Sequence, residues 1–215
     1  LVGSEMCIRD RIIVRVEPRQ TTDLLPEPVS FGVVYQDEDL IVVDKPAGLI
    51  VHPSPGHWTG TLVHGLLHRF PDIGDMGATE RPGIVHRLDG STSGLMVVSR
   101  NERTHELLSR AFQERKVRKE YLGLVWGNPG KKEGTIDLPV GRDPRNRYRM
   151  AVRADGKKAV TIFRTLWTRG GFSFINCRLM TGRTHQIRVH MKHLGCPLAG
   201  DSLYAPRKKD FPGFD

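Results

Sequence analysis

Two apolar runs that flank a short glycine-containing segment constrain the fold of this chain more than any other feature. Residues 159–167 and 172–179 are rich in β-branched and aromatic side chains, and Thr168-Arg169-Gly170-Gly171 separates them. Runs of this composition form strands, and a short connection with glycine folds neighbouring strands back on each other. The pattern therefore predicts an antiparallel β-hairpin and disfavours a doubly wound parallel sheet.

Similar patterns extend this hairpin into a larger sheet. Further strands are predicted over 31–35, 40–43, 119–127 and 136–140. Apolar spacing predicts helices over 61–70 and 101–115, and a third helix is expected to begin with Thr184 as its N-cap and to end at Gly195. Since strands outnumber helices and many are joined by hairpins, we expect an α+β fold with a mixed, mainly antiparallel sheet flanked by helices.

Two regions of unequal size are predicted. Residues 1–28 are expected to hold a non-native read-through at 1–11, a strand at 12–16 and a proline-containing linker at 18–28. Residues 29–215 are expected to form one main domain, because a 215-residue chain with 38% hydrophobic content can bury one sizeable core.

The charge of the chain favours a polyanionic partner. The 33 Lys and Arg residues exceed the 24 Asp and Glu residues, which gives a net charge of +9. Residues 141–169 alone contain seven arginines and two lysines against two aspartates. A solvated basic face is the simpler interpretation of such a run, but arginine suits phosphate and base contacts better than lysine does, so we favour contact with RNA or DNA.

The sequence gives no sign of a metal centre or a membrane span. Cys7, Cys177 and Cys196 are far apart and form no C-x-x-C pair, so neither a disulfide framework nor a zinc ribbon is indicated. His64 and His68 stand four residues apart, but no acidic third ligand is close by. No apolar run reaches about 18 residues. We therefore expect no metal, no membrane contact and a reducing cytoplasmic location.

A single carboxylate, Asp89, lies between two apolar runs. Residues 84–88 precede it, and the polar turn 90–94 separates it from a second run at 95–98. This order predicts a strand, a loop and a second strand, with Asp89 at a strand end where a scaffold can present it for chemistry. For an isolated Asp-Gly pair, a simple turn role is the more common interpretation.

Two further segments carry candidate functional side chains. In the strand predicted over 119–127, Tyr121 shares a face with Gly123 and Val125, so Tyr121 is not obliged to be part of the core. The start of the third helix carries Arg183 and Arg188, and a helix N-terminus with arginines is a natural anion site. Taken singly, Tyr121 is more often sheet packing and Arg188 more often a surface charge.

Taken together, these segments resemble the RluA-type RNA pseudouridine synthases. The carrying residues are 81–94 (RPGIVHRLDGSTSG), 119–127 (KEYLGLVWG) and 179–191 (LMTGRTHQIRVHM), together with 44–48 (DKPAG) and 200–204 (GDSLY). The similarity runs in order from about 31 to 204, and it is greatest to the branch that acts on large-subunit ribosomal RNA. It implies the pseudouridine synthase catalytic fold.

The resemblance also implies residue roles. It makes Asp89 the catalytic residue and Arg188 its ion-pair partner, while Tyr121 would stack on the uracil and help remove the C5 proton. Arg87 would fill the space that the flipped nucleotide leaves. Further RNA contacts are expected from Arg183, His185 and Gln186, although the last two could instead hold the helix start.

The implied function is isomerisation of specific uridines to pseudouridine in RNA. The uracil is cut from C1′, turned over and rejoined through C5 after base flipping, in an Asp-dependent rearrangement that needs no cofactor or metal. Large-subunit ribosomal RNA is the expected substrate. Transfer RNA and a non-catalytic RNA-binding module remain alternatives, whereas a metal-dependent nuclease would want clustered carboxylates beside Asp89. We expect a monomer.

Two departures from the family pattern are visible. The family continues past GDSLY into an H-A-x-x-L strand, which this chain does not reach, so we expect a C-terminally truncated fold with weak stability and reduced activity. Members of the large-subunit branch often carry an S4-type RNA-binding domain, and residues 12–16 resemble its last strand. Loss of that domain would lower the affinity for RNA.

Overall fold

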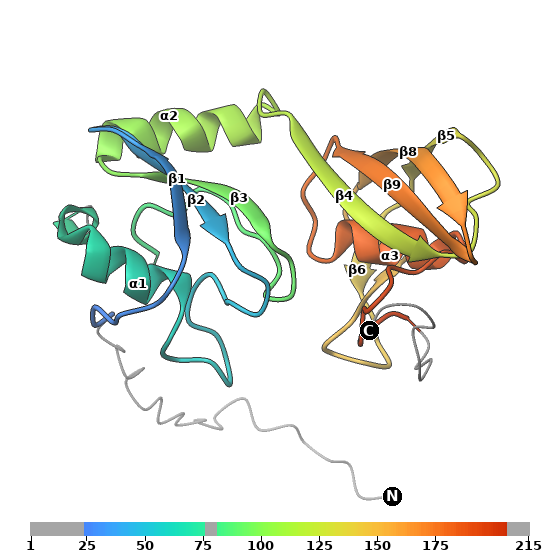
Figure 1. The fold of residues 1–215 in the computed structure, drawn as a ribbon, viewed down its shortest axis with the longest axis horizontal. Helices are drawn as coiled ribbons and strands as arrows, with labels where there is room; N and C mark the ends of the chain where they lie inside the picture. The colour runs from blue at the N-terminus through green and yellow to red at the C-terminus, as the bar shows by residue number, and fades with distance from the viewer. Residues whose placement is uncertain (1–23, 76–80, 206–215) are drawn as a thin grey trace, which may run out of the picture.

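The computed structural model describes residues 24–75 and 81–205 (Figure 1). The read-through predicted at 1–11 and the strand predicted at 12–16 lie outside these ranges. Within them, the elements gather into two lobes, one on either side of the chain that runs from α2 into β4 (Figure 1).

The first lobe is a small antiparallel sheet covered by helices. Its strands are β1 (Gly32–Gln36), β2 (Leu40–Lys45) and β3 (Gly94–Ser99), in the order β1-β2-β3. Helix α1 (Leu62–Arg69) and the 3-10 helix η1 (Pro71–Asp75) pack on one side, and α2 (Glu102–Gln113) follows β3. Asn101 caps α2, because its side chain accepts a hydrogen bond from the Thr104 N–H at 2.9 Å.

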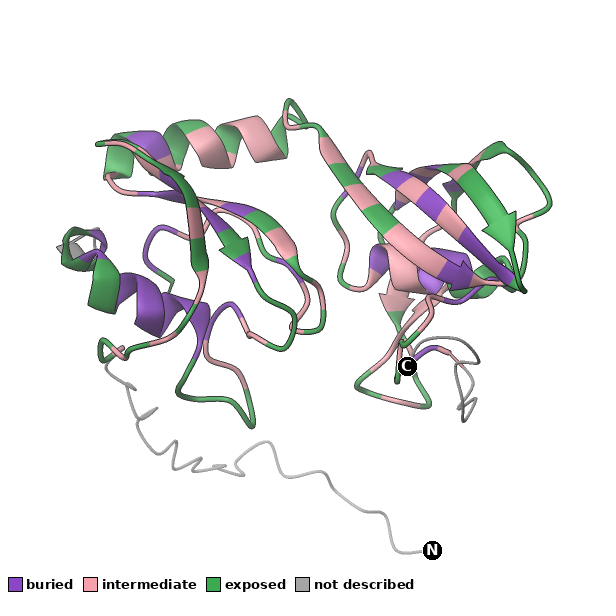
Figure 2. Cartoon of the chain, in the orientation of Figure 1, coloured by how far each residue is buried: buried purple, intermediate pink, exposed green. Residues whose placement is uncertain are grey.

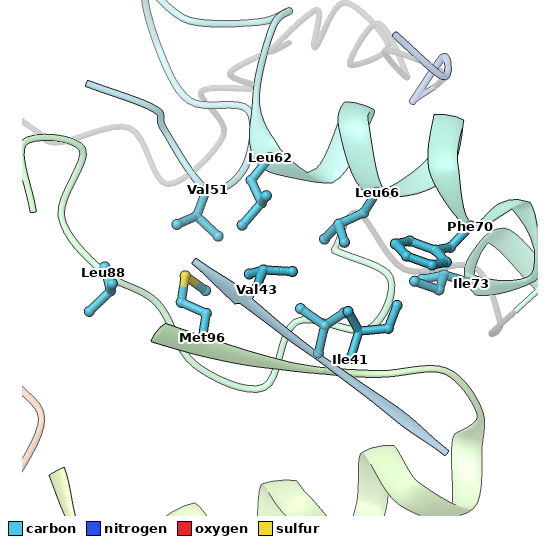
Figure 3. Close-up of a cluster of buried hydrophobic side chains, with 10 residues drawn as sticks. Ile41, Val43, Val51, Leu62, Leu66, Phe70, Ile73, Leu88 and Met96 are labelled. Atoms are coloured by element: carbon cyan, nitrogen blue, oxygen red, sulfur yellow. The ribbon is translucent and has the colours of Figure 1, made fainter. Parts of the chain in front are cut away.

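The period of each element explains the core of this lobe. Ile41 and Val43 are two residues apart on β2 and share one face, while Leu62 and Leu66 are one helical turn apart on α1. These faces meet in a buried cluster (Figure 3). Its members are Ile41, Val43, Val51, Leu62, Leu66, Phe70, Ile73, Leu88, Met96 and Val98.

The second lobe contains a larger antiparallel sheet and a short two-stranded arm. The sheet has β4 (Lys119–Trp126), β5 (Glu133–Asp137), β8 (Val160–Arg169) and β9 (Phe172–Leu179), in the order β4-β9-β8-β5. The arm pairs β6 (Val140–Arg142) with β7 (Met150–Val152). Helix α3 (Gln186–His193) packs near the arm and β8. Figure 2 shows burial alternating along β9, as expected of a sheet with one face on a core.

The predicted hairpin is confirmed. Arg169 pairs with Phe172, so the turn consists of Gly170 and Gly171 alone. Both glycines have positive φ, at 58° and 80°, which is the geometry that matches the right-handed twist of adjoining strands. The α+β class is likewise confirmed, and every strand pairing among the described residues is antiparallel, although the strands divide into three sheets rather than one.

The strand predicted over 84–88 does not form, and this prediction was wrong. One isolated bridge joins Ile84 to Val98, after which the segment leaves β3. The His86 side chain explains the departure: its Nε2 accepts the Val97 N–H at 3.0 Å, which is a bond that a strand partner would otherwise make. Asp89 therefore ends an extended segment without strand pairing.

Within residues 24–75 and 81–205, no helix is both long and apolar enough to cross a membrane.

Candidate active site

Asp89 lies in a segment whose backbone is fixed on both sides. Before it, the Gly83 carbonyl accepts hydrogen bonds from the Ser99 N–H and hydroxyl. After it, the fully buried Lys45 ammonium donates to the carbonyls of Pro46, Leu49 and Gly90, the last at 3.2 Å. A buried ammonium with three carbonyl partners has its donors satisfied, so Lys45 anchors the turn that follows Asp89.

Arg188 joins Asp89 from the other lobe. Its Nη1 donates to Asp89 Oδ2 at 2.9 Å, and its Nε and Nη2 donate to the two oxygens of Asp201 at 2.7 and 2.9 Å. The Asp201 side chain is only 4% exposed. Burial opposes the charge of Arg188, but the hydrogen bonds that it donates to the two carboxylates outweigh burial and raise the pKa of the guanidinium. The same pairing lowers the pKa of Asp201 against its burial.

The start of α3 differs from its prediction. Thr184 is not the N-cap; His185 occupies that position, in the left-handed conformation with φ 56°. The helix begins at Gln186, whose amide accepts from the Thr181 hydroxyl at 2.7 Å and the Arg183 N–H at 3.0 Å. Gln186 is 2% exposed. This is the arrangement of a residue that holds the helix start, which was one of its two expected roles.

The other residues expected to contact RNA at this turn are partly exposed. Arg183 donates through Nε to the Lys158 carbonyl at 3.0 Å. His185 Nδ1 lies 2.7 Å from the Tyr204 hydroxyl, and its Nε2 lies 3.8 Å from Asp89 Oδ2. The structure therefore brings His185 to the Asp89 carboxylate and leaves Arg183 at the edge of the same turn.

Tyr121 is partly buried, so the face of β4 that it shares with Gly123 and Val125 is not the exposed one. The exposed side belongs to Leu122, which is 64% exposed, while Tyr121 packs against the apolar clusters of both lobes. Burial raises the pKa of the phenol, and the charge of Asp89 raises it further. Tyr121 therefore presents a neutral ring beside Asp89 at the junction of the two cores.

Arg87 lies on the surface of the Asp89 segment. Its Nη1 donates to His52 Nε2 at 3.2 Å. His52 is 4% exposed, and burial, together with the charges of Arg87 and Arg81, lowers its pKa to about 4. A neutral imidazole at neutral pH is the acceptor that this contact needs, so the buried ring orients an exposed guanidinium.

The sequence reasoning missed the residues that support this site. Asp201 and Tyr204 lie in the GDSLY segment, to which no role was assigned, and His52 lies outside the motifs described above. The sequence feature that could have identified Asp201 is a second carboxylate that follows Arg188 along the chain. Among the described residues, no group of three or more His, Cys, Asp or Glu side chains could hold a metal ion.

Comparison with known proteins assigns the chain to a family. Residues 39–193 match the family model of RNA pseudouridylate synthases. The chain belongs to this family. A Bacillus subtilis protein named as an uncharacterized RNA pseudouridine synthase is 47% identical over 205 residues, which cover 95% of this chain and 68% of that protein. Ribosomal large subunit pseudouridine synthase D of Xanthomonas campestris is 45% identical over 91% of this chain and 58% of its own length.

Solved structures of family members share the fold. Human RNA pseudouridylate synthase domain containing 1 has a TM-score of 0.68 at 28% identity, over 89% of this chain and 74% of that one. A second human member, domain containing 4, has a TM-score of 0.66 at 27% identity, over 82% of this chain and 70% of that one. The chain spans from 52% to 68% of the lengths of the curated relatives.

Proposed function

We propose that this chain isomerises uridine to pseudouridine in RNA, with Asp89 as the catalytic carboxylate. The observation that carries the proposal is the ion pair between Asp89 and Arg188, because it brings two motifs from separate lobes into contact at 2.9 Å. Family membership supplies the reaction class. Arg188 Nη1 donates a hydrogen bond to this carboxylate, and a carboxylate can serve as a nucleophile or as a base.

The proposed rearrangement requires few groups beyond these residues. The bond between N1 and C1′ breaks, the uracil turns, and C5 bonds to C1′ while the C5 hydrogen leaves and N1 gains a proton. Asp89 would act as nucleophile or base in this sequence, and Tyr121 would hold the detached ring by stacking. The target nucleotide has to leave its helix first, because C1′ and C5 are not both accessible in a stacked duplex. Arg87 would then occupy the vacated space.

Ribosomal RNA of the large subunit is the substrate that we propose. Relatives from Xanthomonas campestris and Neisseria meningitidis, at 45% and 46% identity, are named for that activity. The net charge of +9 favours binding of ribosomal RNA and of transfer RNA alike, because both are polyanions. A comparison of large-subunit ribosomal RNA fragments with transfer RNA transcripts as substrates distinguishes the two candidates.

Tritium release from RNA that carries [5-³H]uridine tests the reaction directly, since bond formation at C5 expels that hydrogen. We expect release by the chain and a loss of at least about 10³-fold in Asp89→Asn, with RNA binding in a filter assay retained. Glu106→Gln, an exposed acidic residue on α2, is the matched control and should leave both measurements unchanged. Equal release by Asp89→Asn and the unaltered chain would remove Asp89 from the mechanism.

A further inference from the structure

The segment Asp201–Tyr204 builds a second layer behind the ion pair of Asp89 and Arg188. Arg188 contacts this segment twice, through its bonds to Asp201 and through the Tyr204 ring, whose centroid lies 4.9 Å from the guanidinium carbon. Tyr204 then reaches His185, which returns to Asp89. The contacts form a closed ring of four side chains, Asp89, Arg188, Tyr204 and His185, and Asp201 supports it from behind Arg188.

Asp201 fixes the direction of Arg188. Its Oδ1 accepts from Arg188 Nη2 and from the N–H groups of Leu203 and Tyr204, and its Oδ2 accepts from Arg188 Nε. Two of the three guanidinium nitrogens are thereby held by a buried, fully bonded carboxylate. The third, Nη1, is left to donate to Asp89 Oδ2.

Tyr204 determines which ring nitrogen of His185 carries the proton. The Tyr204 oxygen accepts the Met150 N–H at 2.7 Å, so its own proton is available for His185 Nδ1, also at 2.7 Å. A neutral histidine that accepts at Nδ1 carries its hydrogen on Nε2. The Nε2 atom lies 3.8 Å from Asp89 Oδ2, the oxygen that Arg188 already contacts, so it faces this oxygen without a hydrogen bond to it.

Burial keeps the His185 ring neutral at neutral pH. Burial lowers the pKa of its ring. The carboxylates of Asp89 and Asp201 oppose that effect, whereas the guanidiniums of Arg188 and Arg87 add to it. The neutral ring therefore carries one N–H, and the tautomer decides which nitrogen bears it. The ring does not add a second positive charge to that of Arg188.

We propose that Tyr204 is a positioning residue that sets the His185 tautomer, so that the His185 Nε2–H faces Asp89 Oδ2, the oxygen that Arg188 holds, and Oδ1 is left as the reacting oxygen. Among residues 24–75 and 81–205, the hydrogen bond from Arg188 and the 3.8 Å approach of His185 Nε2 both reach Oδ2 of Asp89, and neither reaches Oδ1. The inference rests on the proposed function, because it names which atom of the catalytic carboxylate meets the uridine.

The test uses Tyr204→Phe in the full chain. This change keeps the ring on Arg188 and removes the hydroxyl. We expect kcat for tritium release to fall about 10-fold with KM for RNA changed less than about two-fold. Two-bond ¹H–¹⁵N correlation spectra should show His185 leaving the Nε2–H tautomer. Tyr35→Phe removes an exposed hydroxyl bonded to Asp37 and serves as the matched control, with no change in either measurement.

A double-mutant cycle separates positioning from general damage. The amide of His185→Gln offers a nitrogen near the Nε2 position without a tautomer, so adding Tyr204→Phe to it should cost no further activity. Equal additional losses in both backgrounds would overturn the proposal. An unchanged His185 tautomer in folded Tyr204→Phe would also overturn it, whether or not the chain releases tritium. Absence of release by the unaltered chain would instead contradict the proposed function, and the spectra would still decide the role of Tyr204.

Discussion

The side chain of Arg188 divides its nitrogen atoms between two carboxylates, and this division has a consequence for substitution. An ammonium is a point donor without the planar fork of arginine, so Arg188→Lys cannot hold Asp201 and Asp89 in the same geometry. Asp201 would remain buried without its bidentate partner, and we expect a loss of about 2–4 kcal/mol in the free energy of unfolding. Tritium release should fall about 10²-fold or more.

Arg153→Lys is the matched control for stability. Arg153 also binds an aspartate through Nε and Nη2, both at 2.7 Å, but Asp155 is 68% exposed. Surface pairs contribute less than about 1 kcal/mol, so urea unfolding should hardly change. Equal losses in the two lysine variants would contradict the role assigned to burial of Asp201.

Two histidines tie stability to pH. The pKa values of His52 and His86 are lowered to about 4, mainly by burial. Below about pH 6.5 the unfolded chain binds a proton at each ring while the folded chain does not, so stability is present above that pH and falls as pH drops towards 4. The loss approaches roughly 2–3 kcal/mol per ring. Urea unfolding at about pH 7.5 and about pH 4.5 measures it.

The variant His86→Asn provides the comparison for this pH dependence. It removes one of the two titrating rings, and the slope of stability against pH should decrease between about pH 6.5 and 4.5. A slope that stays the same would show that His86 does not contribute. At neutral pH the variant should be less stable, because the ring accepts the Val97 N–H and stacks on Phe112 at 4.6 Å.

At the scale of elements, one glycine anchors the segment that carries Asp89. Gly83 has φ 73°, and a Cβ there would lie 2.6 Å from the Ser99 carbonyl oxygen and 2.8 Å from Val98. Gly83→Ala should therefore destabilise the fold by about 3 kcal/mol or more, because backbone strain and a backbone clash act together. Gly130 has the same φ with nothing within 4 Å of its Cβ position. Gly130→Ala should lose only about 1 kcal/mol, and equal thermal shifts in the two variants would contradict this account.

Elements with strong periodicity could be predicted from the sequence. The β8–β9 hairpin follows from alternating side chains and two glycines, and α2 begins within one residue of the prediction. The segment at 84–88 could not be predicted, because a side chain of that same segment takes the hydrogen bond of β3. The burial of Tyr121 could not be predicted for another reason. Side chains alternate between the two faces of the strand as expected, but the neighbour on the opposite face, Leu122, is an exposed apolar residue.

The residues of the candidate active site likewise divide into those that the sequence predicts and those that it does not. Asp89 and Arg188 were recognised by their motifs and do meet. Asp201 was missed because its role depends on a bidentate geometry that only the folded chain creates between residues 13 positions apart. Tyr204 was missed because its hydroxyl acts through His185. The roles assigned to Arg87 and Arg183 stay predictions.

At the scale of the whole molecule, the positive charge gathers on the arm in a form that suits RNA. Tyr148 on the loop between β6 and β7 is 86% exposed, and Arg145 and Arg147 beside it are exposed as well. Tyr148→Ala should weaken RNA binding about 10-fold through lost stacking, with the salt dependence unchanged. Changing Arg145 and Arg147 to Gln should instead reduce the slope of log affinity against log salt by about 0.7 per arginine.

Leu107→Ala is the control for this surface. Leu107 is an exposed apolar residue of α2 at 55% exposure, and its loss should leave both affinity and salt slope unchanged. Filter binding at several salt concentrations measures all three variants. A weakening by Tyr148→Ala that matches Leu107→Ala would remove Tyr148 from the RNA surface.

The junction between the lobes also determines how the chain could be divided. Residues 114–118 link α2 to β4, and each side of this link has a core of its own. A cut there would leave Asp89 on one fragment and Arg188 and Tyr121 on the other. Neither fragment would contain all of the candidate catalytic residues. Pseudouridine formation would therefore require the two fragments to reassemble, as in a complementation assay.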